Sequence, residues 1–132
     1  MRFVFPFTVP ANTLAAARHE EKVEVVRGRL SRVEIAFPPG PAALVHVVIL
    51  ENLFQFAPAL EGESFAWDDY TFGFDMDYAL PDRVPVLTLA GWSPGTYFDH
   101  QVTFHFDVKV EAEEDERDLI RQLVQGMALP GR

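Results

Sequence analysis

The sequence predicts an all-β domain, an antiparallel β-sandwich or jelly-roll-like arrangement of seven to eight strands. Short apolar segments separated by turns rich in Pro and Gly are typical of such sandwiches. In residues 101–110, QVTFHFDVKV, every second side chain is apolar, as in an antiparallel strand with one face in water. In residues 43–50, ALVHVVIL, both faces are apolar except at His46, so we expect both faces of this strand to be covered.

Residues 1–10 form the first predicted unit, an N-terminal extended arm or an edge strand. Phe3, Phe5 and Phe7 fall on alternate positions, so they share one face of an extended strand. Pro6 has no N–H to donate to a neighbouring strand, which favours an edge position. Two interpretations remain: an edge strand of its own domain, or an arm that lies on a neighbouring subunit and whose removal leaves the sandwich folded.

Residues 11–110 are predicted to form the sandwich itself. Near its start, Asn12 or Thr13 could cap a short helical turn. Gly28 is predicted to lie in a turn between two strands or in a bulge of one long strand. The turn at 38–41, PPGP, is predicted to be rigid because proline fixes φ. The remaining strands are predicted over residues 22–27, 29–37, 54–56, 71–76 and 84–92.

Residues 111–132 form the third predicted unit, a C-terminal amphipathic α-helix with a short tail. Acidic residues occupy positions 113–116, where the helix dipole favours them, and the apolar residues that follow share one stripe. The stripe consists of Leu119, Ile120, Leu123, Val124 and Met127. Burying each such side chain is worth roughly 1.5–3 kcal/mol, so we expect the helix to cover an open face of its own sheet or to pack on a partner.

The charge balance limits the kinds of partner. The chain of 132 residues has a net charge of −9, and its 11 basic residues are scattered, whereas phosphate backbones require clustered Lys and Arg. No apolar segment approaches the roughly 18 residues of a membrane-spanning helix. We therefore expect neither nucleic acid nor a membrane as a partner. The absence of Cys excludes disulfides and thiolate metal sites, and it fits a cytoplasmic location.

The sequence contains no recognisable catalytic motif, so we expect no enzymatic activity and no cofactor. Asp68, Asp69, Asp75 and Asp77 are candidates for a metal site because carboxylates are the ligands that Ca²⁺ prefers. Asp75 and Asp77 also alternate with apolar residues, which indicates the solvated face of a strand, and we favour this interpretation over a metal site. His46 lies among apolar residues and is predicted to be a packed strand residue with one hydrogen bond.

Three large aromatic residues suggest an alternative function. Trp67, Trp92 and Tyr97 carry rings of the kind that stack on sugars in carbohydrate-binding sandwiches, where carboxylates hold the hydroxyl groups. Residues 61–83 contain seven acidic side chains that could serve in this way. A carbohydrate- or other ligand-binding module is therefore the alternative, although for these rings we favour packing in a core or an interface.

Four segments carry a resemblance to a known group of proteins. FTVPANT at 7–13, GRLSRVEIAFPPGPAALVHVVI at 28–49, FQFAP at 54–58 and DHQVTFHFDV at 99–108 occur in this order. This order resembles small β-sandwich proteins encoded by phages and other viruses near virion genes. The resemblance implies an accessory virion protein, such as one that decorates a capsid, located in the virion and forming a homo-oligomer. It implies no catalytic residues.

We therefore predict a non-enzymatic structural protein that stabilises an assembly through its apolar arm and its C-terminal helix. The predicted interface residues are Phe3, Phe5, Phe7, Leu119, Leu123 and Met127. The assembly would consist of further copies of the chain, of a larger structure such as a capsid, or of both.

Overall fold

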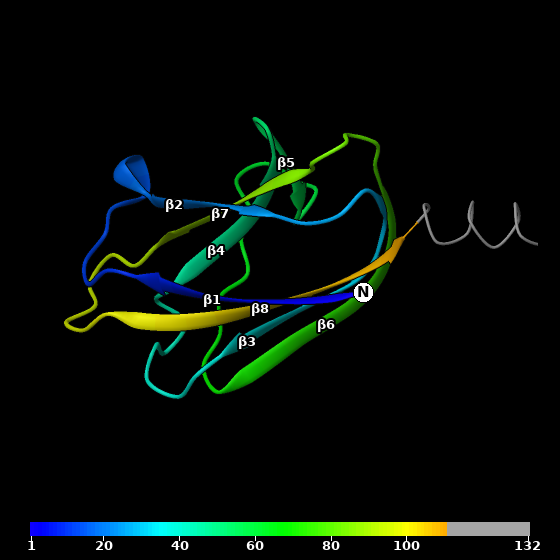
Figure 1. Ribbon diagram of the computed structural model, residues 1–132. Helices are drawn as coiled ribbons and strands as arrows, with labels where there is room; N and C mark the ends of the chain where they lie inside the picture. Colours follow the sequence, from blue (N-terminus) through cyan, green and yellow to red (C-terminus); the bar gives the residue numbers. More distant parts are fainter. Residues whose placement is uncertain (111–132) are drawn as a thin grey trace, which may run out of the picture.

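The computed structural model describes residues 1–110, which form two four-stranded antiparallel sheets packed face to face (Figure 1). The first sheet has the strand order β1–β8–β3–β6, and the second sheet has the order β2–β7–β4–β5. The elements are β1 (Arg2–Val9), the short 3-10 turn η1 (Ala15–Ala17), β2 (His19–Glu24), β3 (Gly28–Phe37), β4 (His46–Glu51), β5 (Phe54–Ala57), β6 (Tyr70–Leu80), β7 (Val86–Trp92) and β8 (His100–Val110). The predicted all-β sandwich is confirmed.

The strand order is that of a jelly roll. β1 pairs with β8, β2 with β7, β3 with β6 and β4 with β5. The chain therefore follows the path of one long hairpin that is rolled up, so that successive pairs fall in alternate sheets. The predicted helix at 111–132, with the interface residues Leu119, Leu123 and Met127, lies outside the described residues.

The core lies between the two sheets and is rich in phenylalanine. In β8 the buried side chains alternate with half-buried and exposed ones, as the sequence predicts. The largest buried side chains include Phe7, Phe104, Phe106, Leu30, Ile35, Ile49, Leu80, Leu87 and Leu89. Phe104 contacts Phe7 edge to face, with ring centroids 5.9 Å apart. Aromatic pairs of this geometry add to the free energy gained from burial.

β1 is an edge strand of its own domain. It pairs with β8 along its whole length, from Arg2 opposite Asp107 to Val9 opposite His100. Phe7 and Val9 are fully buried in the core. The interpretation of residues 1–10 as a separable arm is therefore wrong, because their removal would take buried side chains from the core and leave β8 without its outer neighbour.

The predicted interface role of Phe3, Phe5 and Phe7 is corrected in the same way. All three side chains point between the sheets. Phe7 belongs to the core itself, and Phe3 and Phe5 are half-buried against it. The alternation of the sequence predicts which face of the strand is apolar, but it does not distinguish a core from a partner as the surface that covers this face.

Two backbone details correct the predicted strand boundaries. The strand expected from residue 43 begins at His46, because Ala42 and Ala43 have positive φ angles of 51° and 62° in a turn. Gly28 begins β3, and the irregularity in pairing falls two residues later, between Leu30 and Arg32. Gly28 is required because a Cβ at this position would lie 2.1 Å from the carbonyl oxygen of Lys109.

The outer faces of the two sheets differ in character. On the first sheet several outward side chains form ion pairs: Arg32 lies 2.9 Å from Asp75, and Arg2 pairs with Glu34. On the second sheet the outward side chains Val48, Leu50 and Ala90 form a small apolar cluster, against which Trp92 packs. The prediction that both faces of β4 are covered is confirmed for these residues.

Candidate functional site

Four exposed aromatic side chains lie at one end of the sandwich, which we call the aromatic end: Trp67, Tyr97 and Phe98 on loops, and Tyr70 at the start of β6. Their exposed fractions are 55%, 51%, 89% and 75%. Two of them, Trp67 and Tyr97, are predicted ligand residues. Tyr70 is an aromatic residue of the same acidic segment as Trp67, whereas Phe98 is new, and the only sequence signal for Phe98 is its position shortly after the Pro94-Gly95 turn.

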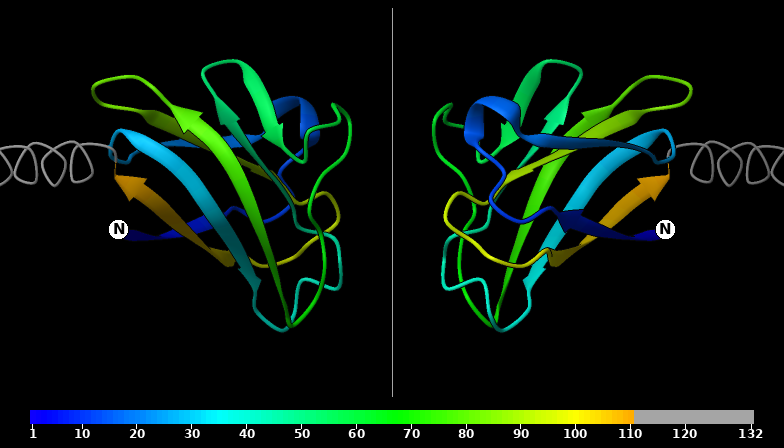
Figure 2. Two further views of the ribbon diagram at one scale, coloured as in Figure 1. Left: turned by 90° about the vertical axis from the view of Figure 1, so that its right-hand side faces the viewer. Right: turned by 90° about the vertical axis from the view of Figure 1, so that its left-hand side faces the viewer.

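Strand pairing explains why these loops meet. Phe37 at the end of β3 pairs with Tyr70 at the start of β6, and Ala36 pairs with Thr103 near the start of β8. The loops that precede β6 and β8 therefore leave the first sheet at the end where β3 finishes (Figure 2). The turn after β3 lies against the start of β8, because a Cβ on Gly40 would be 3.6 Å from His100 Nε2.

The 93–99 loop, which carries Tyr97 and Phe98, is held to the segment after β1 by hydrogen bonds. The Gly95 N–H donates to Asn12 Oδ1 at 3.0 Å, and the Asn12 N–H donates to Thr96 Oγ1 at 2.9 Å. The Ala11 N–H donates to Asp99 Oδ1 at 2.8 Å. Asn12 therefore fixes the loop and does not cap the helical turn as predicted.

The buried Ser93 side chain also links the 93–99 loop to the segment after β1. Its hydroxyl donates to the Pro10 carbonyl at 2.6 Å and accepts from the Thr13 N–H at 3.2 Å. The Thr96 hydroxyl donates to the Ser93 carbonyl at 2.9 Å, and both side chains are buried. The loop is thus fixed at both ends, whereas the two aromatic side chains that it carries extend into solvent.

The loop that carries Trp67 is fixed by Asp68. One carboxylate oxygen, Oδ1, accepts from the Gly40 N–H at 2.8 Å and from the Ala42 N–H at 2.9 Å. The Asp69 N–H donates to the Pro38 carbonyl at 3.2 Å. The rigid PPGP turn and the Trp67 loop are therefore joined, and Asp68 serves the backbone of this turn.

The four candidate metal ligands do not come together. Asp75 and Asp77 lie on the outer face of the first sheet, paired with Arg32 and Arg29. The hydrogen bond from Arg29 lowers the pKa of Asp77 below its ordinary value. Within residues 1–110, no three His, Asp or Glu side chains form a group that could hold a metal ion. The side chains of Asp75 and Asp77 are 83% and 76% exposed, so these two residues lie on a solvated strand face, as their alternation predicts.

Trp92, the third predicted ligand residue, lies on the outer face of the second sheet. Its ring is half-buried and stacks on His46, with centroids 5.5 Å apart and planes 8° apart. His46 Nδ1 lies 2.9 Å from Ser64 Oγ, and burial lowers the pKa of His46. The prediction that His46 is a packed strand residue with one hydrogen bond is confirmed.

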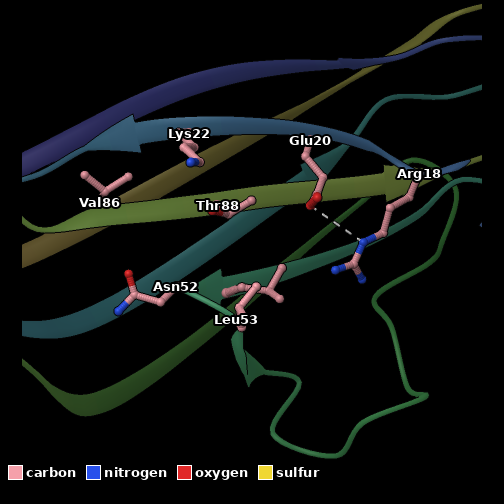
Figure 3. Close-up of a pocket in the computed structure, with 8 residues that line it drawn as sticks. Arg18, Glu20, Lys22, Asn52, Leu53, Val86 and Thr88 are labelled. Carbon is pink, nitrogen blue, oxygen red and sulfur yellow. Dashed lines mark ion pairs between the residues drawn. The ribbon is translucent and has the colours of Figure 1, made fainter.

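A second feature, which the sequence analysis did not identify, is a hollow of about 840 Å³ on the outer face of the second sheet (Figure 3). We call it the second-sheet hollow. It is lined by Arg18, Glu20, Lys22, Leu50, Asn52, Leu53, Val86 and Thr88. The doubly apolar pattern of β4 signals a covered outer face here, but it does not indicate a hollow.

Comparison with known proteins identifies no relative by sequence, because no family model and no curated protein matches the chain. Among solved structures, the chain is similar to the Yersinia pseudotuberculosis-derived mitogen, with 9% identity over 83% of this chain and 86% of that one and a TM-score of 0.44. PirA matches with 12% identity over 79% and 93% of the two chains and a TM-score of 0.43.

A third similar structure is the VP2 subviral particle of infectious bursal disease virus, with 8% identity, a TM-score of 0.39 and coverage of 82% of this chain and 32% of that one. Likenesses of this size say nothing about activity or partners.

None of the described residues belongs to a helix long and apolar enough to cross a membrane.

Proposed function

We propose that this protein is a non-enzymatic structural domain that associates with further copies of itself through the aromatic end. The observation that carries the proposal is the contrast between a fixed loop and its exposed rings. Tyr97 and Phe98 are the most exposed aromatic residues of the described chain, and they lie on a loop whose backbone is hydrogen-bonded at both ends.

Exposing apolar rings to water costs free energy, and so does ordering a flexible loop when it binds a partner. Exposed apolar patches on monomers commonly mark interaction sites, and Trp and Tyr dominate the binding energy of interfaces. A loop that is already ordered loses less conformational entropy on association. The nearby carboxylates of Asp68 and Asp99 accept hydrogen bonds from backbone N–H groups, which holds the loops of the aromatic end in place.

The virion is the setting that we propose for this assembly, because of the resemblance of the sequence to accessory virion proteins. In that setting the protein would decorate or stabilise a capsid. The segment FTVPANT, which carries part of that resemblance, contains the residues that fix the aromatic loop, so the resemblance and the candidate surface involve the same part of the chain.

The experiment is sedimentation velocity over a concentration series. The natural chain should associate as its concentration rises, and Tyr97→Ser/Phe98→Ser should remain monomeric. Leu53→Ser is the matched control, because Leu53 is 94% exposed on the β4–β5 turn, away from the aromatic end. Association of the double variant at the concentrations at which the natural chain associates would refute the proposed surface.

Carbohydrate binding is the second candidate function. It is favoured by the exposed rings of Trp67 and Tyr97 at the same end of the molecule. Titration with oligosaccharides should then change the tryptophan fluorescence in a saturable way, and Trp67→Ala should abolish the change. A chain whose fluorescence is unaffected by the oligosaccharides would leave self-association as the candidate.

A further inference from the structure

β2 is an edge strand of the second sheet, and in the described part of the chain no strand pairs with its outer side. The Val25 N–H donates to the Pro85 carbonyl at 3.1 Å, which continues the register between β2 and β7. Because residues along an antiparallel strand alternate in the direction of their backbone groups, Glu20, Lys22 and Glu24 direct their N–H and C=O groups away from β7. All three residues are exposed, so this open edge can bind a further strand.

The side chains of β2 alternate in charge. The outer face of the strand and of the residue before it carries Arg18, Glu20, Lys22 and Glu24 in order, and the first three line the second-sheet hollow (Figure 3). An antiparallel pair of two β2 strands with its two-fold axis at Glu21 would place Arg18 opposite Glu24 of the second copy. It would also place Glu20 opposite Lys22. Each contact occurs twice by symmetry, so all four join opposite charges, which stabilises strand pairing.

The charges favour this register over its neighbours. An axis between two residues is excluded, because backbone groups of the open edge must face each other. An axis at Lys22 would bring Lys22 opposite Lys22 and Glu20 opposite Glu24, and like charges oppose pairing. An axis at Glu20 would bring Glu20 opposite Glu20 and Arg18 opposite Lys22. Larger shifts leave fewer residues of the strand paired, so the axis at Glu21 fits best.

The other three edges of the sandwich lack this self-complementarity. Asp75 and Asp77 on β6 give that edge charges of one sign, which is a common protection against strand pairing. β5 has only four residues and an irregular register. β1 contains Pro6, which has no N–H to donate.

We propose that two copies of the chain join through their β2 edges in the register centred on Glu21, so that the second sheet continues from one copy into the other. Each strand contributes six residues, and interfaces well below about 1,200 Å² are weak. We therefore expect the contact at roughly millimolar concentration, above the range of association through the aromatic end. Copies that another contact already holds together would present their edges at an effective concentration of this order.

The test uses the full chain carrying Tyr97→Ser/Phe98→Ser, which removes rings of the aromatic end, so that failure of this proposal and failure of the proposed function are separate results. In a dilution series followed by NMR, the amide signals of Glu20, Lys22 and Glu24 should shift with concentration, and those of β6 should not. Signals that are independent of concentration would overturn the proposal. Slow amide exchange of the three residues at every dilution would also overturn it, because it would assign the edge to an occupant within the same chain.

Charge reversal in the same background tests the register. Lys22→Glu and Glu20→Lys each turn two of the four contacts into like-charge contacts, and each should weaken the association about tenfold. An equimolar mixture of the two variants should recover it, because positions 20 and 22 then carry one sign in one variant and the opposite sign in the other. Glu20→Lys/Lys22→Glu keeps the net charge of −9 and should associate like the parent. A mixture that associates no better than its components would overturn the register.

One like-charge contact gives an independent check. Glu21 lies on the proposed axis, so the two Glu21 side chains face each other on the other side of the sheet, each with Oε1 3.4 Å from Nε2 of its own His19. Glu21→Gln should therefore strengthen the association. Glu61→Gln, which removes the same charge from the loop after β5, should leave it nearly unchanged. Equal effects of the two substitutions would contradict an axis at Glu21, and the signals of β8 report that every variant remains folded.

Discussion

At the scale of single residues, Gly28 shows how the absence of a Cβ allows two strands to approach closely. The glycine brings the backbone of β3 against the Lys109 carbonyl, where a Cβ would lie at 2.1 Å. Sequence reasoning identifies Gly28 as special but not why, because the carbonyl that excludes a side chain belongs to a strand about eighty residues away.

We expect Gly28→Ala to lower the free energy of unfolding by about 2–3 kcal/mol, because backbone on both strands must move. Gly73→Ala is the matched control in the neighbouring strand. There the added Cβ meets only the end of the Arg32 side chain, at 2.6 Å, and this side chain can rotate away. The control should cost less than about 1 kcal/mol. Equal losses in urea unfolding would contradict this explanation.

The hydroxyl of Tyr78 provides a pH-dependent prediction. It donates to Glu51 Oε1 at 2.8 Å, and burial together with this carboxylate raises the pKa of Tyr78 from 10.0 to about 12. Between these values the unfolded chain releases the phenolic proton and the folded chain retains it. The contribution of Tyr78 to stability is therefore complete below pH 10 and is lost as the pH rises toward 12.

Thermal unfolding of the natural chain and of Tyr78→Phe between pH 9 and 12 measures this effect. The natural chain should lose stability more steeply than the variant in this window. Below it, the variant should be less stable by about 1 kcal/mol, the usual net contribution of a hydrogen bond. Parallel curves for the two proteins would show that the Tyr78 proton is not linked to folding.

At the scale of elements, β1 shows what alternation in a sequence can and cannot predict. The alternation of Phe3, Phe5 and Phe7 correctly predicts an extended strand and its apolar face, and Pro6 correctly predicts its edge position. Neither signal predicts the partner strand, because β1 and β8 are joined only by the tertiary fold. The hydrogen bonds between 10–13 and 93–99 cannot be predicted from the sequence either, since they connect residues more than 80 positions apart.

For β1 we expect Phe7→Ala to cost about 3–5 kcal/mol, because it leaves a cavity in the core. Val4→Ala on the same strand should change the free energy of unfolding by less than about 0.5 kcal/mol, since Val4 is 53% exposed. Deletion of residues 1–10 should abolish the cooperative transition. If the deletion variant unfolded cooperatively at the same temperature as the natural chain, residues 1–10 would be a separable arm after all.

At the scale of the whole molecule, the jelly roll divides the surface into regions with different chemistry. The first sheet turns a paired, charged face to solvent, the second sheet has a hollow with an apolar floor, and one end presents aromatic rings. Period-two alternation predicts the fold class and the inward faces of the strands, but it does not distinguish a jelly roll from other sandwiches. The aromatic end could not be predicted from the sequence, because its loops come together only when the strands pair.

The mass of the full chain in solution, measured by light scattering along a dilution series, tests the central proposal most directly. Self-association through the aromatic end predicts a mass that is a multiple of 14.9 kDa at high concentration and falls to 14.9 kDa on dilution. A mass of 14.9 kDa at every concentration would contradict it.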